Sequence, residues 1–170
     1  MAKAFSIQFR LPSRIVALGL VLPLILLVAG SWIGAHYPVH TGPSAHIYYL
    51  SPTGNDQNSG ASADAAWASF DRAWRDLYPG DTLILLDGIY RQTLQPNQRN
   101  GEPDRPITVR AQHDGQAIID GEGVRVPVTL DSYEFGMVGS YYIIEGIVAR
   151  NSVGAVYMIG QDHNVLRRVS

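Results

Sequence analysis

Four arginines could place cationic side chains along one surface of the folded chain. Arg110, Arg150, Arg167 and Arg168 lie in or beside short segments rich in β-branched residues. A guanidinium group presents planar donors that match a carboxylate, so Arg is well suited to bind anionic groups. Side chains projecting from neighbouring strands could together contact an acidic glycan. These four arginines are the predicted substrate-binding residues.

Acidic residues offer a second kind of chemistry. The candidates lie near strand ends and turns: Asp120, Glu122, Asp131, Glu145 and Asp162. Aligned on one sheet, they could hold calcium, or supply the two carboxyl groups of a glycoside hydrolase, about 5–9.5 Å apart. The alternative is that Asp and Glu beside Gly end strands and cap turns. Both interpretations stay open at this stage.

A turn-rich segment near the start of the domain resembles part of a calcium loop. Asp56, Asn58 and Gly60 follow the alternating spacing of such a loop, but Trp67 stands where an EF-hand has its bidentate acid. Asp56 and Asn58 are therefore predicted calcium ligands, with calcium as the only cofactor considered. The alternative is that both side chains form turns by bonding to their own backbone.

Composition excludes several classes of protein. Lys3 is the only lysine, so a lysine base is absent from the rest of the chain, and the absence of cysteine excludes disulfides and thiolate chemistry. After the three cations of the leader, 10 Arg stand against 15 Asp and Glu, a net charge of about −5. A nucleic-acid-binding domain normally has the opposite charge balance, so nucleic acid is not expected as a partner.

The N-terminal 34 residues read as an export element. A basic start precedes the uncharged run Ile15–Gly34, which is long enough to span a bilayer and has its cations on the N-terminal side. Two alternatives remain: a cleaved signal peptide, or an uncleaved anchor that associates with the membrane. Either predicts a protein that is periplasmic, extracellular or anchored facing outward. Residues 35–46 read as a linker, and residues 47–170 as the folded domain.

Within the domain we predict one helix and many short strands. Trp67, Phe70 and Trp74 fall on one face of a predicted helix over Asp64–Tyr78, begun by Asp64 and ended by Pro79-Gly80. The predicted strands are Ile47–Leu50, Thr82–Leu86, Ile107–Ala111, Ala117–Asp120, Val126–Leu130, Tyr141–Glu145, Ala155–Ile159 and Asn164–Val169. Their starts recur at roughly 20–25 residues, which predicts a solenoid whose repeats bury their apolar faces against each other.

Ordered pieces of the chain resemble a known family. They are Tyr49-Leu-Ser-Pro52, Gly54–Gly60, Trp67–Trp74, Pro79–Leu83, Gly88–Tyr90, Pro106–Ala111, Ile119–Gly121 and Tyr142–Gly146. Together they resemble the N-terminal portion of exported right-handed parallel β-helix proteins of the pectate-lyase-like superfamily, from Tyr48 to the end of the chain. The resemblance implies an all-β solenoid with an N-terminal capping helix, continuing beyond Ser170, since the sequence stops inside a predicted strand.

The resemblance also implies a function. In such lyases, calcium or a cationic side chain neutralises a uronate carboxylate, and a Lys or Arg base removes the neighbouring proton. The first hypothesis is the N-terminal portion of a carbohydrate-active, lyase-like enzyme acting on acidic polysaccharide, inactive as this portion alone. The second is a non-catalytic cell-envelope or glycan-binding module. The absence of lysine after Lys3 favours the second for this portion.

Overall fold

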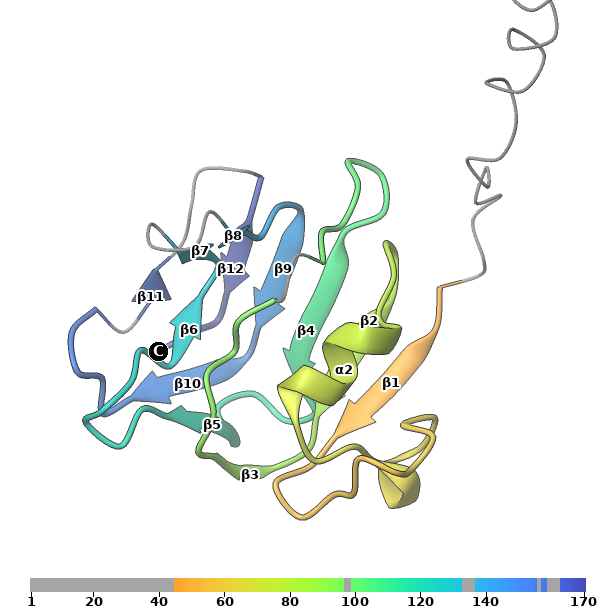
Figure 1. Cartoon of the computed structure of the whole chain (residues 1–170), viewed down its shortest axis with the longest axis horizontal. Coiled ribbons are helices and arrows are strands. Elements are labelled where there is room, and N and C mark those ends of the chain that lie inside the picture. Colours follow the sequence, from red (N-terminus) through yellow and green to blue (C-terminus); the bar gives the residue numbers. More distant parts are fainter. Residues whose placement is uncertain (1–44, 97–98, 133–136, 156, 159–162) are drawn as a thin grey trace, which may run out of the picture. The chain divides into compact units, whose positions relative to one another are not determined.

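The structure is a computed structural model that describes residues 45–96, 99–132, 137–155, 157–158 and 163–170. The described chain forms short, mostly parallel strands and one α-helix (Figure 1). The predicted export element, nearly all of the predicted linker, and Asp162 lie outside these residues. No helix within them is long and apolar enough to cross a membrane.

Three parallel sheets run along the stack of strands. Sheet A, in spatial order, contains β1 (Ile47–Leu50), β2 (Thr82–Leu85), β4 (Ile107–Ala111), β9 (Tyr142–Glu145) and β12 (Val165–Arg167). Sheet B contains β3 (Gly88–Tyr90), β5 (Ala117–Asp120) and β10 (Ile147–Arg150), and sheet C contains β6 (Val128–Thr129) and β11 (Tyr157–Met158). An antiparallel pair, β7 (Asp131–Ser132) and β8 (Met137–Val138), lies between two turns of the coil.

The chain visits the three sheets in turn, which is the path of a parallel β-helix. It passes from β4 to β5 to β6, and then from β9 to β10 to β11, before it returns to sheet A at β12. Each strand therefore pairs with the strand one turn of the coil away, as in the solenoid predicted from the sequence.

The period of roughly 20–25 residues predicted from the sequence describes only part of the coil. The equivalent sheet A positions Thr82, Thr108, Ile143 and Val165 are 26, 35 and 22 residues apart. Only the interval from Ile143 to Val165 falls within the predicted range, and the interval from Thr108 to Ile143 is far longer. The spacing is irregular because only the strands must align from one turn of the coil to the next, while the loops between them differ in length.

Inward-facing side chains stack in rows through the coil. Leu83, Val109 and Ile144 are fully buried and occupy equivalent positions on successive strands of sheet A. Tyr90 and Ile119 form a corresponding buried row on sheet B. Each fully buried aliphatic side chain contributes about 1.5–3 kcal/mol, so these rows account for much of the driving force for stacking.

The helix is shorter than predicted. A 3-10 turn, η1 (Ala63–Ala65), precedes α2 (Phe70–Asp76), so the predicted helix over Asp64–Tyr78 is wrong at both ends. The backbone of Trp67 instead exchanges hydrogen bonds with β1, at 2.9 Å to the Tyr49 carbonyl and 2.9 Å from the Ser51 N–H. Ser69, not Asp64, caps the helix, because its hydroxyl accepts from the Arg72 N–H.

Helix α2 closes the interior of the first turns of the coil. Its buried face presents Phe70 to the ring of Tyr90 at 5.9 Å, and Trp74 edge-on to the ring of Tyr142 at 6.1 Å between centroids. The aromatic stripe of the sequence is therefore core and covers the stacked rows.

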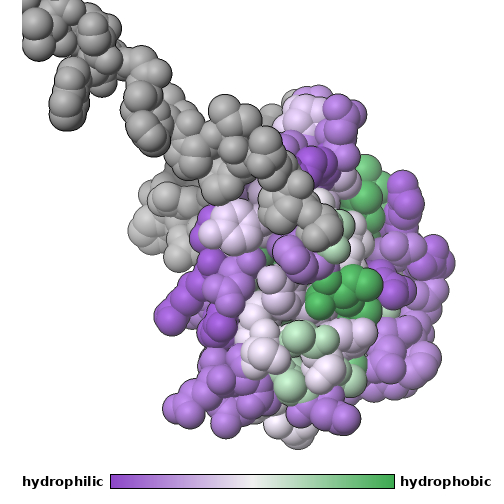
Figure 2. Space-filling view, turned by 90° about the vertical axis from the view of Figure 1, so that its right-hand side faces the viewer, coloured by the Kyte–Doolittle hydropathy of each residue, from purple (hydrophilic) through white to green (hydrophobic). Residues whose placement is uncertain are grey.

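The side of the domain next to β1 has a mixed surface. Figure 2 shows apolar and weakly polar atoms in a central band between hydrophilic margins. Strand β1 contributes an exposed aliphatic side chain, Ile47, at 53% exposure.

Candidate functional site

The outer face of sheet A carries the candidate site. Strand alternation sends every second residue of β4, β9 and β12 to this face, since neighbouring residues of a strand point to opposite sides. Parallel register aligns Arg110 of β4 with Glu145 of β9, and Glu145 with Arg167 of β12. Adjacent strands are about 4.8 Å apart, so these three residues form one continuous charged row.

Two cations in this row are available to a ligand. Arg110 and Arg167 are both exposed, and neither guanidinium has a hydrogen-bond or ion-pair partner among the described residues. Glu145, between them, is paired with Arg168 instead. The Arg168 Nε atom also lies 2.6 Å from Asp114 Oδ2. Arg168 thus ties the turn after β4 to β9, and leaves Arg110 and Arg167 exposed and unpaired.

Polar pairs continue into the turns that follow sheet A. His113 Nδ1 lies 2.9 Å from Asp87 Oδ2 and 3.1 Å from Oδ1, joining two successive turns of the coil. Asp114 pairs with Arg168 in the same region. At this edge of the sheet, Asp87 therefore shares hydrogen bonds with the His113 ring and Asp114 is neutralised by Arg168.

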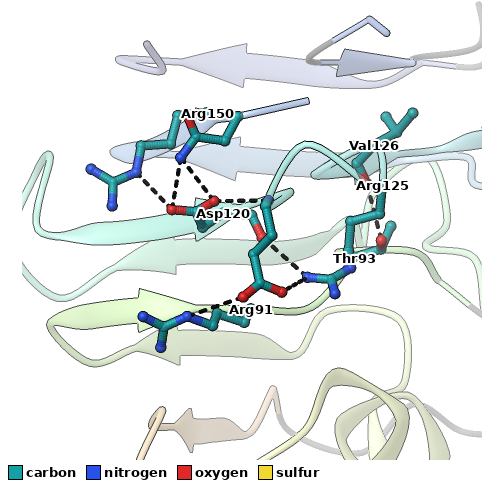
Figure 3. A network of polar contacts seen from close by, with 8 residues as sticks. Arg91, Thr93, Asp120, Arg125, Val126 and Arg150 are labelled. Carbon is teal, nitrogen blue, oxygen red and sulfur yellow. Dashed lines mark hydrogen bonds and ion pairs between the residues drawn. The ribbon is translucent and has the colours of Figure 1, made fainter. Parts of the chain in front are cut away.

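A second polar cluster lies at the end of sheet B and is centred on a buried carboxylate (Figure 3). Asp120 is 6% exposed and accepts from Arg150 Nε at 2.9 Å and from Asn151 Nδ2 at 3.0 and 3.1 Å. It also accepts from the backbone N–H of Glu122 at 2.9 Å. The Glu122 N–H, the Asn151 amide and the Arg150 guanidinium together hold the pKa of Asp120 below its ordinary value.

The same network extends to a third turn of the coil. Glu122 Oε2 lies 2.8 Å from Arg125 Nη1, and Glu122 Oε1 lies 3.3 Å from Arg91 Nε. In Figure 3 the side chains converge from three successive strand ends. Protein donors occupy both carboxylates of this cluster, so we interpret it as a structural clamp between turns.

The four predicted arginines thus fall into two groups. Arg110 and Arg167 share the outer face of sheet A, and Arg168 follows in the next turn. Arg150 lies on sheet B instead, where it pairs with Asp120. The structure brings three of the four together and commits Arg150 and Arg168 to ion pairs.

The predicted calcium ligands lie in the loop that positions α2. Asp56 accepts from the N–H groups of Ala68 and Ser69 at 2.8 and 2.9 Å, and from the Ser69 hydroxyl at 2.6 Å. Burial raises the pKa of Asp56, but these hydrogen bonds outweigh burial and leave the pKa lowered. Asn58 donates its amide to the Ala66 carbonyl and accepts from Trp67 Nε1 through its backbone oxygen.

N–H and hydroxyl groups of the chain itself donate hydrogen bonds to the Asp56 carboxylate. A cation would have to displace these donors in order to bind. No group of three or more His, Asp or Glu suited to a metal occurs within the described residues. Calcium binding at Asp56 and Asn58 stays a prediction. Of the other acidic candidates, Asp120 and Glu122 share one cluster and Glu145 lies in another, while the side chain of Asp131 is outside the description.

Sequence reasoning missed the partners of these residues. It did not predict the His113–Asp87 pair, the link of Asp114 to Arg168, or the stacking of Tyr141 on His163. Each joins positions 22 to 54 residues apart. The register of the strands would have identified these partners, but loops of unequal length prevent its prediction from the sequence.

Comparisons with known proteins agree with this fold. The family model of chondroitinase B matches residues 66–164. Pectate lyase L of Dickeya dadantii is 30% identical over 132 residues, which cover 73% of this chain and 31% of that protein. The lacto-N-biosidase of Bifidobacterium longum is 31% identical over 118 residues, covering 65% of this chain and 7% of that protein.

Among solved structures, the lacto-N-biosidase of Eubacterium ramulus has a TM-score of 0.49 at 22% identity, covering 61% of this chain and 20% of that one. The chain spans about a third of the length of pectate lyase L and a much smaller part of the Bifidobacterium protein. The family model matches more than half of the chain. The chain therefore belongs to the chondroitinase B family, within the pectate-lyase-like parallel β-helix proteins.

Proposed function

We propose that this chain is the N-terminal portion of an exported, right-handed β-helix protein that acts as a lyase on acidic polysaccharide. The observation that carries the proposal is the pair of unpartnered, exposed cations, Arg110 and Arg167, on one outer face of a coil of this family. The relatives named above are lyases and a glycosidase, which supports a carbohydrate ligand. The preference for acidic chains rests on the two arginines.

The two arginines would bind and neutralise carboxylates of the polymer. A uronate next to an exposed guanidinium accepts charge-assisted hydrogen bonds in a planar, bidentate geometry. Neutralising that carboxylate makes the adjacent proton easier to remove, which is the first requirement of β-elimination. Arg110 and Arg167 lie two strands apart, about 10 Å, so they would contact different points along one polymer.

Calcium, where it takes part, would supply the same neutralisation as a Lewis acid. The carboxylate of Asp56 is held by three donors of the chain, so no step is assigned to calcium at Asp56 and Asn58. The group that removes the proton is likewise unassigned.

The activity test uses the protein as its gene encodes it. Incubation with polygalacturonate, alginate and chondroitin, with and without calcium, is followed by the ultraviolet absorbance of the unsaturated product. Product from any of the three supports the lyase proposal. Failure with all three, in a sample that binds at least one of them, contradicts it.

A second candidate is a non-catalytic glycan-binding module of the cell envelope. The observation favouring it is that Lys3 is the only lysine of this sequence, so residues 47–170 contain no lysine base. The same incubation separates the candidates, because binding without unsaturated product is the result expected of a module.

Export and anchoring form part of the proposal. The run Ile15–Gly34 would direct the folded domain out of the cytoplasm and, if uncleaved, hold it at the membrane. Cell fractionation with protease added to intact cells provides the check. A domain found in the cytoplasm and protected from protease contradicts this part of the proposal.

A further inference from the structure

Two aromatic rings stack at the N-terminal edge of the outer face of sheet A. The rings of Tyr141 and His163 are nearly parallel, at 9°, with centroids 4.7 Å apart. Each residue stands at the entry to a strand, Tyr141 directly before β9 and His163 two positions before β12. His163 is exposed and Tyr141 is half-buried, so the pair is open to solvent.

The backbone holds both rings in an unusual conformation. Tyr141 has φ of 59° and His163 has φ of 60°, in the left-handed region that bulky residues seldom occupy. The side chain of Asn164 fixes the geometry, because its amide accepts from the Tyr142 N–H at 3.0 Å and donates to the Gly139 carbonyl at 2.6 Å. Backbone strain retained at an exposed position suggests a role beyond packing.

The ring pair lies at the entry to the two strands that carry Glu145 and Arg167. On β12 the exposed side chains are Val165, at 39% exposure, and Arg167, and the exposed His163 precedes the strand. One strand away, Ile143 and Glu145 of β9 pair with Val165 and Arg167, and Tyr141 directly precedes that strand. Four residues separate Tyr141 from Glu145 and His163 from Arg167, so the Cα atoms of each pair are at most about 14 Å apart. From His163 along β12, the exposed side chains thus run from aromatic through aliphatic to cationic.

This order of surface chemistry suits a sugar polymer. One side of a pyranose ring is a sheet of C–H groups that packs on an aromatic ring, while its carboxylate and hydroxyl groups require polar partners. A stacked pair of aromatic side chains is already ordered, so little side-chain entropy remains to be lost when a sugar binds.

We propose that Tyr141 and His163 form an aromatic subsite that packs against a sugar ring of the polysaccharide held by Arg110 and Arg167. The proposal rests on the proposed function for the identity of the ligand. It adds a part of the site that does not depend on the charge of the sugar.

The test compares a charged polymer with a neutral one of the same backbone. The probes are polygalacturonate and its fully methyl-esterified form, titrated into the full chain in mild detergent. The variants Tyr141→Asn and His163→Asn remove the rings, and Asn is chosen because it tolerates the left-handed backbone better than other side chains. We expect the double variant to bind both probes about two- to tenfold more weakly. Arg110→Gln should weaken only the binding of polygalacturonate.

Further variants separate binding from folding. Tyr141→Phe keeps the ring and should keep the affinity for both probes. His163→Asn alone removes an exposed ring and provides a second measurement if the double variant fails to fold. Unchanged affinity of the ring variants for both probes, while Arg110→Gln weakens polygalacturonate, overturns the subsite and leaves the proposed function standing. Absence of binding of either probe by the unaltered chain overturns both.

Discussion

Removing the carboxylate of Asp56 is expected to destabilise the domain substantially. In Asp56→Ala, the N–H groups of Ala68 and Ser69 and the Ser69 hydroxyl lose their acceptor. A typical hydrogen bond contributes about 1 kcal/mol, and those to charged groups contribute more. The site is only partly buried, so water replaces some of these bonds, and we expect a loss of about 2–3 kcal/mol. The start of α2 should loosen with it.

The assay is urea unfolding, followed by the fluorescence of the buried tryptophans Trp67 and Trp74. Asp64→Ala is the matched control, because Asp64 is an exposed carboxylate in η1, the turn that precedes α2 in the chain, and its loss should change stability by less than about 0.5 kcal/mol. A loss below about 0.5 kcal/mol in Asp56→Ala would show that these three hydrogen bonds do not stabilise the domain.

The same experiment tests calcium. Each protein is unfolded once with calcium chloride and once with a chelator. If the carboxylate acts only through its hydrogen bonds, the loss is equal in both conditions. Calcium that stabilises the unaltered chain but not Asp56→Ala would instead establish the metal site predicted from the sequence.

The remaining predictions concern pH and close packing. Asp56 and Asp120 have lowered pKa values in the folded state, so the folded chain binds fewer protons than the unfolded chain. Their contribution is complete above the unfolded pKa of about 3.9 and is lost as the pH falls through the folded values. The urea midpoint should therefore fall below about pH 4, and fall less in Asp120→Asn; a midpoint that rises there contradicts the assignment. Gly60→Ala places a Cβ atom 2.3 Å from the Trp67 ring at φ 71°, and should cost about 2–4 kcal/mol. Gly115→Ala, at φ 77° with nothing within 4 Å, should cost only about 1 kcal/mol, and equal losses in the two variants would show that the contact with Trp67 is unimportant.

Local patterns in the sequence predicted the strands well. Ile107–Ala111 and Ala117–Asp120 were predicted with their observed bounds, because apolar residues between turn-forming clusters leave little choice. β3 and β10 were missed as separate strands. The chain bends between sheet A and sheet B at Gly88, the first residue of β3, and at Gly146, directly before β10. In the sequence, each of these glycines reads as the end of the preceding strand.

The helix and the site depended on contacts that local patterns do not contain. Trp67 fits a helical stripe, but its backbone pairs with β1 and its ring packs against Gly60. Local patterns also did not show which arginines are unpaired and so available to bind a ligand. Whether Arg150 or Arg167 is paired depends on residues of the neighbouring strand in the sheet. Neighbouring strands of sheet A are separated by an irregular 22 to 35 residues in the sequence, so local patterns do not identify the partner residues.

The central claim is that the unpaired arginines of sheet A bind an acidic polymer. The most direct measurement is the dissociation constant of polygalacturonate for the unaltered chain, for Arg110→Gln with Arg167→Gln, and for the exposed control Arg75→Gln on α2. Each exposed charge pair contributes up to about 1 kcal/mol, so the double variant should bind up to about 25-fold more weakly, with a smaller difference at high salt. The control should bind like the unaltered chain. Equal affinity of all three proteins would contradict the assignment of this face as the binding site.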